Sequence, residues 1–270
     1  MINILQTEFF RLKKNVLFWA LLGVCAVLPL MTALVELALF SGIGAIDTGV
    51  EYDNIWEFIR ASNIGGAAIS SIPNLSADLQ LFGVICTSIF LCKEFSGGTF
   101  RNMLLANHSR RDLYLSYLLM SVTIGACFLG VEFVSTLFFN GVIFGFGTMK
   151  AASVVSACVL SLTLGLISVI FVQSMTCMFM FATRKLAVTL ACPLAVIFAL
   201  AFIFSFVEMG SQLGLISATD MSWIPLYNLN MLDLTAIDGA LIGKILLYLL
   251  PLTALFGSLG WIAFRKADLK

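Results

Sequence analysis

Few side chains in this sequence could carry catalysis or bind a metal ion. His108 is the only histidine, which excludes an HExxH zinc motif and any multi-histidine metal site. The sequence has no GxSxG segment of the kind that holds a serine nucleophile. The segment Gly239–Lys244 superficially resembles a phosphate-binding loop, but it is one residue short and continues with Ile245 instead of Ser or Thr. We therefore expect no active site and no ATP-binding loop in this chain.

The cysteines all fall inside long apolar segments, and no two of them form a CxxC pair. They are Cys25, Cys86, Cys92, Cys127, Cys158, Cys177 and Cys192. Cysteines in such surroundings usually behave as small apolar residues. We therefore expect neither structural disulfides nor a zinc site.

A polar stretch, KEFSGGTFRNMLLANHSRRDLYLS, interrupts the apolar sequence from Lys93 to Ser116. Its Ser-Gly-Gly-Thr segment is a break followed by a candidate helix cap, and 99–107 can form two helical turns. A short helix lying along the membrane between two spans could act as a lever on which a partner protein docks. The alternative is an ordinary basic loop that only sets the topology of the chain.

One acid, Glu132, lies in the middle of an apolar segment with no basic neighbour in sequence. A charge in the membrane centre costs at least ~3 kcal/mol, so such a residue is a candidate functional site. It either faces a polar cavity or translocation path, or it is protonated or paired with Ser or Thr on a neighbouring helix. Gln173 and Ser174 interrupt another apolar segment, and we expect interhelical hydrogen bonds there.

The elements that must hold these residues are membrane helices. The chain has 270 residues, of which 60% are hydrophobic and 11% charged, with a mean hydropathy of +1.04. Soluble domains carry roughly 25% charged residues, and a membrane helix needs about 20 mostly apolar ones. The sequence predicts an all-α polytopic membrane protein, with 1–270 forming one transmembrane domain. The six predicted spans are Val16–Phe40, Asn74–Cys92, Leu113–Phe139, Ala151–Ala182, Leu186–Val207 and Leu241–Phe264.

The distribution of Lys and Arg predicts the orientation of these spans. Most basic residues fall in the N-terminal segment, the stretch 93–111, the pair Arg184–Lys185 and the C-terminal tail. The opposite side carries mainly acids, in the predicted extracellular segments 41–73 and 208–239. We therefore expect both termini and the polar stretch to be cytoplasmic. The net charge is zero, so nothing indicates a nucleic-acid partner.

The first fifteen residues have the pattern of an amphipathic helix in the cytoplasmic interface. Apolar residues repeat at intervals of three and four, and polar residues share the opposite face. The apolar set is Ile2, Leu5, Phe9, Leu12 and Val16, and the polar set is Asn3, Thr7, Arg11 and Lys14. This helix is either a plain contact with membrane lipid or a surface that also touches a cytoplasmic partner.

The polar stretch resembles the segment E-x3-GT-x4-L-x4-SR of membrane subunits of type-2 ATP-binding-cassette exporters. The matching residues are Glu94, Gly98, Thr99, Leu104, Ser109 and Arg110. The layout is also similar: an amphipathic start, six spans, a long first outer loop and cytoplasmic termini. The large polar outer domain of some relatives is missing, and the small size resembles bacterial permeases for export of, or immunity to, antimicrobial peptides.

The resemblance implies a permease that pairs with a second copy of itself and with two copies of a separate ATPase subunit, which would bind ATP and Mg²⁺. Segment 1–15 would be the connecting helix and 94–107 the coupling helix. Residues expected to couple to the partner are Phe9, Arg11, Lys14, Glu94, Gly98, Thr99, Arg101, Leu104, Ser109 and Arg110. Residues expected along the translocation path are Phe82, Ile85, Phe90, Glu132, Phe198 and Phe202.

The apolar character of the second and fifth spans, which usually line the path in that family, suits a hydrophobic or amphipathic cargo. Toxin or antimicrobial peptides are the first expectation, and drugs or other lipophilic molecules the second. A different class of function is a non-transport membrane scaffold or sensor whose basic loops bind a cytoplasmic regulator. An ATPase partner would distinguish the exporter from the scaffold. We expect the chain in a bacterial plasma membrane.

Overall fold

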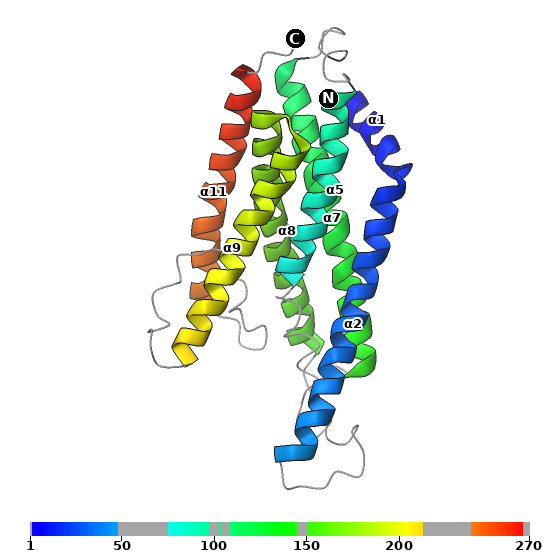
Figure 1. Ribbon diagram of the computed structural model, residues 1–270, viewed down its shortest axis with the longest axis vertical. Helices are drawn as coiled ribbons and strands as arrows, with labels where there is room; N and C mark the ends of the chain where they lie inside the picture. The colour runs from blue at the N-terminus through cyan, green and yellow to red at the C-terminus, as the bar shows by residue number, and fades with distance from the viewer. Residues whose placement is uncertain are drawn as a thin grey trace.

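The computed structural model describes residues 2–47, 75–97, 103, 109–144, 151–212 and 239–266. Over these ranges all regular secondary structure is helical, and each predicted apolar segment forms one helix. The helices, shown in Figure 1, are α1 (Ile2–Lys13), α2 (Val16–Asp47), α5 (Leu75–Ser96), α7 (Arg110–Ile143), α8 (Ala151–Thr183), α9 (Leu186–Gln212) and α11 (Gly239–Lys266). The all-α fold class is confirmed.

Four of the helices are long and apolar enough to cross a membrane. Their apolar parts are Val16–Val35, Arg110–Ile143, Val155–Thr183 and Ile242–Lys266. In α9 the apolar helical stretch, Leu186–Leu200, is shorter than these four. The chain is thus a multi-pass membrane protein, while the full count of six spans, which requires α5 and α9, stays a prediction.

The helix ends differ from the predicted boundaries because hydrogen bonding, not hydropathy, decides where a helix stops. Helix α2 continues to Asp47, into the segment predicted as extracellular, and α9 continues to Gln212. At the end of α5, the Gly97 N–H donates to the Lys93 carbonyl over 3.0 Å and closes the last turn. Glu94 therefore belongs to the last turn of α5. Of 98–108, only Met103 is described, and it is helical, so most of the predicted coupling helix 94–107 lies outside the described residues.

Helices α7 and α8 form the centre of the bundle, and the others pack around them (Figure 1). Helices α1 and α2 pack on α7, α11 packs mainly on α8, and α9 contacts α8 and α5. Helix α5 lies against both α7 and α8. The helices α2, α5, α7, α8, α9 and α11 alternate in direction. As a result α1, the ends of α5, α8 and α11 and the starts of α7 and α9 lie toward one end of the molecule (Figure 1).

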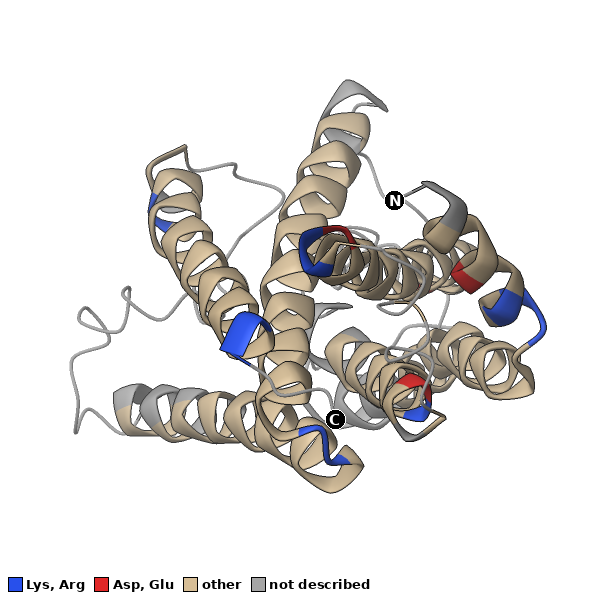
Figure 2. Cartoon of the chain, turned by 90° about the horizontal axis from the view of Figure 1, so that it is seen from above, with Lys and Arg blue, Asp and Glu red and all other residues tan. Residues whose placement is uncertain are grey.

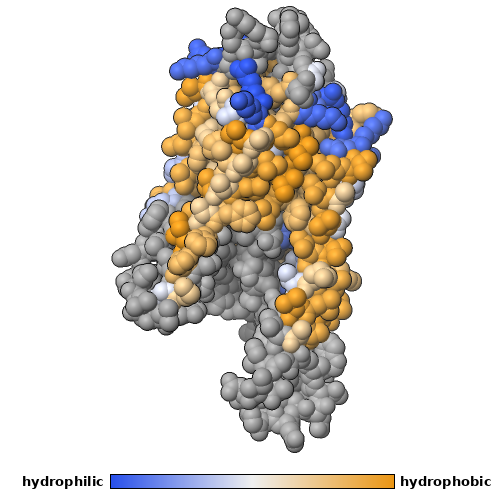
Figure 3. All heavy atoms as spheres, viewed as in Figure 1, coloured by the Kyte–Doolittle hydropathy of each residue, from blue (hydrophilic) through white to orange (hydrophobic). Residues whose placement is uncertain are grey.

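This end gathers the basic residues, and we call it the basic end. Every Lys and Arg in the described ranges lies there except Lys244, which is near the start of α11 at the opposite end. Figure 2 looks down on the molecule and shows Lys and Arg on several different helices around it. Figure 3 shows hydrophilic side chains at the upper end and a broad apolar surface below them. The fold therefore brings to one end the Lys and Arg residues that are predicted from the sequence to be cytoplasmic.

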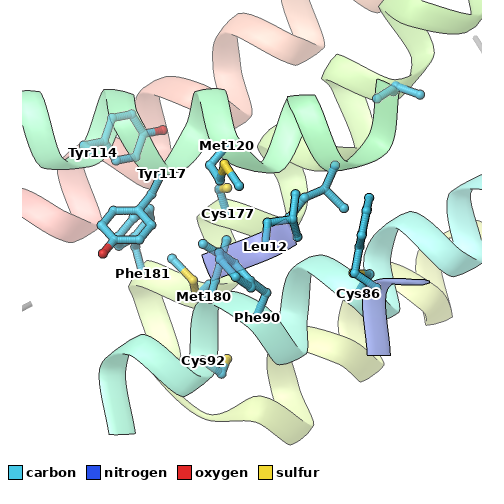
Figure 4. Close-up of a cluster of buried hydrophobic side chains, with 14 of the residues drawn as sticks. Leu12, Cys86, Phe90, Cys92, Tyr114, Tyr117, Met120, Cys177, Met180 and Phe181 are labelled. Atoms are coloured by element: carbon cyan, nitrogen blue, oxygen red, sulfur yellow. The ribbon is translucent and has the colours of Figure 1, made fainter. Parts of the chain in front are cut away.

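The largest buried cluster joins α5, α7 and α8 near the basic end, and Figure 4 shows part of it. Tyr114 and Phe181 place their ring centroids 5.2 Å apart, and Phe264 from α11 lies 4.7 Å from Phe181. Tyr117 and Met120 are fully buried beside them. Since lipid is as apolar as these side chains, close packing rather than the hydrophobic effect holds such helices together. This packed core fixes the ends of α5 and α7 relative to each other.

Candidate coupling site at the basic end

Helix α1 packs on the bundle through a side that carries apolar residues and an acidic one. Ile4, Glu8 and Leu12, spaced by one helical turn, are buried against the rest of the protein. Phe9 and Val16, which belong to the apolar set of the sequence pattern, are 45% and 80% exposed on the protein surface. Glu8 can take a buried position because it finds charged and hydroxyl partners inside.

Arg11 joins α1 to the last turn of α5. Its Nη1 atom donates to Glu94 Oε2 over 2.6 Å and to Glu8 Oε1 over 3.2 Å. The Glu94 contact connects residues 83 positions apart in the chain, whereas Glu8 is three positions away on the same helix. Charge-assisted hydrogen bonds of this length are the stronger class of hydrogen bond. The single guanidinium thus links two carboxylates from two elements.

Tyr117 on α7 extends this group. Its hydroxyl lies 3.5 Å from Glu8 Oε1 and 3.8 Å from the sulfur of Met103, the one described residue between Gly97 and Ser109. We call Glu8, Arg11, Glu94 and Tyr117 the charged cluster. It ties α1, α5 and α7 together next to the segment that connects α5 to α7.

The electrostatics of the charged cluster are unbalanced. Glu8 is 1% exposed, and Glu94 is also buried, so two carboxylates share one arginine. Burial raises the pKa of the Glu8 carboxyl, and the charge of Glu94 raises it further. Arg11 opposes this increase through its charge and its hydrogen bond. The Glu8 Oε2 atom is buried and lacks a hydrogen-bond partner among the described residues. The cluster is therefore sensitive to any change in its one cation.

The remaining predicted coupling residues lie at α1, at the start of α7, or outside the described residues. Phe9 and Lys14 lie on the outward side of α1, away from the charged cluster. Ser109 caps α7, because its Oγ accepts from the Asp112 N–H over 3.0 Å. Arg110 Nη1 donates to the Arg265 carbonyl over 2.9 Å and so ties the start of α7 to the end of α11. The other four lie outside the described residues: Gly98, Thr99, Arg101 and Leu104.

The structure does not gather the predicted path residues in one place. Phe90 is buried in the main cluster, and Phe82 is packed against that cluster. Ile85 is half-buried on α5. On α9, Phe198 and Phe202 are 57% and 66% exposed on the surface of the chain. Their role in a path between two protomers stays a prediction.

Glu132 is buried on α7 where that helix meets α2. The Cys25 thiol of α2 lies 3.6 Å from its Oε2 atom and 3.9 Å from the Phe128 carbonyl. The contact with a thiol agrees with the expectation of a polar partner on a neighbouring helix, although that partner was expected to be Ser or Thr. Whether Glu132 also acts in transport stays a prediction.

A second set of polar contacts joins α5, α7 and α8 within the apolar part of the bundle. Gln80 Nε2 donates to Ser168 Oγ over 2.8 Å, which links α5 to α8. Interhelical hydrogen bonds were expected of Gln173 and Ser174 instead. Ser174 Oγ donates to the Phe171 carbonyl of its own helix over 2.7 Å, and Gln173 Oε1 lacks a hydrogen-bond partner among the described residues.

Gln173 is inserted between two glycines: a Cβ on Gly83 would lie 2.9 Å from its Nε2 atom, and one on Gly125 would lie 3.1 Å from it. The absence of side chains at both glycines lets the amide of α8 reach between α5 and α7.

Sequence reasoning missed Glu8 and Tyr117. The available signal for Glu8 was its place as the sole acid in the first fifteen residues, three positions before Arg11. Tyr117 gave no signal, because a tyrosine in an apolar span is usual. In the described part of the chain, no three His, Cys, Asp or Glu side chains form a group that could hold a metal ion.

The helices and the charged cluster define a multi-pass membrane protein with a tightly tied basic end. Comparison with protein families matches residues 4–208 to the ABC-2 family transporter proteins. Since this match covers most of the chain, the protein belongs to that family. The family consists of membrane components of ATP-binding-cassette transporters that work with an ATPase partner and are not the ATPase itself. A search of curated proteins finds no match to the chain.

Proposed function

We propose that this chain is the permease subunit of an ATP-driven exporter in a bacterial plasma membrane. Two copies would pair with each other and with two copies of a separate ATPase, with both termini in the cytoplasm. The family match supports the permease role, and the gathering of cations at the basic end supports the orientation. ATP and Mg²⁺ would be bound by the ATPase, since this chain lacks a phosphate-binding loop.

The contact between Arg11 and Glu94 is the observation that carries the coupling mechanism. It fastens α1 to the last turn of α5, immediately before the connection to α7. Tyr117 adds α7, which begins after that connection. An ATPase that presses on the segment 97–109 would therefore move the ends of α1, α5 and α7 together. Closure of two ATPase subunits on ATP would in this way shift the paired membrane domains from inward-open to outward-open.

The cargo would be hydrophobic or amphipathic, with toxin or antimicrobial peptides first and drugs or other lipophilic molecules second. The exposed phenylalanines of α9, Phe198 and Phe202, support an apolar path between two protomers. They are one helical turn apart and so share a face. Glu132 is buried within the protomer, so it would reach such a path only if α2 and α7 separate.

The test is co-purification of the tagged chain from its native membrane, followed by peptide-stimulated ATP hydrolysis by the recovered complex. We expect a P-loop ATPase in equimolar amount. Glu94→Arg and Arg101→Glu should abolish stimulation while the chain still inserts into the membrane, and Lys185→Gln should leave it unchanged. A pure chain without ATPase, under conditions that keep other transporters intact, would reject the exporter in favour of a scaffold or sensor. Recovery of the ATPase without stimulation by peptides would reject the peptide cargo alone.

A further inference from the structure

The outward side of the α1–α2 junction combines exposed aromatic rings with lysines. Phe10 is 59% exposed and Trp19 is 53% exposed. Lys13 and Lys14 are exposed between them. The one acid of α1, Glu8, is buried on the opposite side in the charged cluster. We call Phe10, Lys13, Lys14 and Trp19 the junction patch; it is positively charged, with no acid from α1 to compensate it.

Two contacts hold the junction patch in shape. The Lys14 Nζ atom lies 4.3 Å from the centroid of the Phe10 ring, a cation–π distance. The Trp19 indole N–H donates to the Lys13 carbonyl over 2.8 Å, so the ring is fixed at the turn between the helices. The start of α2 is itself capped, because Asn15 Oδ1 accepts from the Leu17 N–H over 3.1 Å. Since this cap already occupies a backbone N–H at the helix start, the positive charge of the junction patch comes from the ammonium groups of Lys13 and Lys14.

The junction patch continues directly into an exposed apolar surface on α2. Below Trp19, the same side of α2 exposes Gly23, Val27 and Met31 at four-residue spacing. These residues belong to an apolar stretch that is long enough to cross a membrane. Figure 3 shows the general arrangement, with hydrophilic side chains at the upper end directly above apolar surface. Exposed tryptophan and lysine at such a boundary are characteristic of the headgroup level of a bilayer.

We propose that the junction patch binds the headgroup of an anionic phospholipid in the cytoplasmic leaflet. The ammonium groups of Lys13 and Lys14 would bind the phosphate, and Phe10 and Trp19 would lie among the upper acyl chains. The charge of the patch fits an acidic headgroup, and its continuity with the apolar face of α2 fits a lipid rather than a soluble anion. A cytoplasmic ATPase is the other conceivable occupant, and it is an outcome of the test below. The assignment to the cytoplasmic leaflet rests on the orientation given in the proposed function, whereas the lipid-binding test in detergent does not depend on it.

The test compares purified full-length chain in detergent with added phosphatidylglycerol or with phosphatidylcholine of the same acyl chains. Native mass spectrometry counts bound lipid, and the melting temperature reports stabilisation. We expect phosphatidylglycerol to bind and to raise the melting temperature more than phosphatidylcholine. Lys13→Gln/Lys14→Gln should weaken phosphatidylglycerol binding roughly tenfold or more. The control Lys185→Gln/Lys266→Gln removes the same charge from exposed positions at the basic end and should bind like the wild type.

Equal loss in the two double variants would overturn the proposal, because it would reduce the effect to the overall charge of the basic end. An equal response to glycerol phosphate, which lacks acyl chains, would overturn it by showing a simple anion site. Retained lipid binding in Lys13→Gln/Lys14→Gln, together with loss of a co-purifying ATPase, would assign the patch to that partner instead. If this variant does not fold, Phe10→Ala keeps both charges but removes the ring that holds the Lys14 ammonium in place. It should therefore lower the preference for phosphatidylglycerol, and an unchanged preference would overturn the proposal.

Discussion

Arg11 and Glu94 form an ion pair of 2.6 Å between the N-terminal helix and the last turn of α5. Glu94 is one of the residues by which the polar stretch resembles exporter permeases, and Arg11 was expected to couple to the same partner. The structure shows that these two residues bind each other. Arg11 and Glu94, which are expected from the sequence to be separate contacts with a partner, therefore belong to one connected cluster.

Breaking this pair should destabilise the protein. We expect Arg11→Ala to lower the free energy of unfolding by about 1–3 kcal/mol, since it leaves two buried carboxylates without a cation. The value is below that of a fully buried pair, because the Arg11 side chain is 42% exposed. Glu94→Arg should also destabilise, and Arg11→Glu/Glu94→Arg should recover part of the loss. Melting temperatures in detergent measure this, and equal values for all four proteins would contradict a structural role for the pair.

The charged cluster should make stability depend on pH. The pKa of Glu8 is raised above the ordinary value of a glutamate by burial and by the charge of Glu94, so the folded protein holds this proton more tightly than the unfolded chain does. The stabilisation is complete below the unfolded pKa and is lost as the pH rises through the folded pKa. Glu8→Gln cannot lose a proton, so its melting temperature should fall less than that of the wild type as the pH rises from about 4.5. Parallel curves for the two proteins would contradict this origin of the pH dependence.

The close packing of α8 against α7 predicts that alanine substitutions at two glycines of α7 differ in their effect on stability. A Cβ at Gly125 would lie 2.5 Å from Val169 Cγ1, whereas one at Gly130 would meet nothing within 4 Å. Gly125→Ala should therefore destabilise by roughly 1–3 kcal/mol through overpacking. Gly130→Ala should be neutral, or stabilise by up to about 1 kcal/mol through helix propensity. Thermal unfolding of both variants measures the difference, and similar effects would show that α7 and α8 do not pack in this way.

The cap at the start of α7 gives a test at the end of the resemblance motif. Ser109→Ala should cost about 0.5–2 kcal/mol, because the Asp112 N–H loses its acceptor. Ser109→Asp can accept the same hydrogen bond and should retain most of the stability. If the residue instead serves only to contact a partner, both variants should melt like the wild type and differ in ATPase binding.

Much of this protein could be read from the sequence. A bilayer requires about 20 apolar residues per span and leaves no unpaired backbone groups, so hydropathy alone located every apolar helix. The bias of Lys and Arg likewise predicted which helix ends share a side, and the structure gathers those residues at the basic end. The motif around Glu94 indicated a transporter family to which the chain does belong.

The tertiary structure decided which faces of these helices meet. The apolar repeat in α1 did not indicate that Glu8 is buried, yet Glu8 lies inside because Arg11 and Tyr117 contact it there. Phe90 is buried for a similar reason: its neighbours come from helices far away in sequence. A repeat of apolar residues gives the period of a helix but carries no information on partners from other helices. Membrane helices are apolar on nearly every side, so only their packed arrangement determines which side is buried.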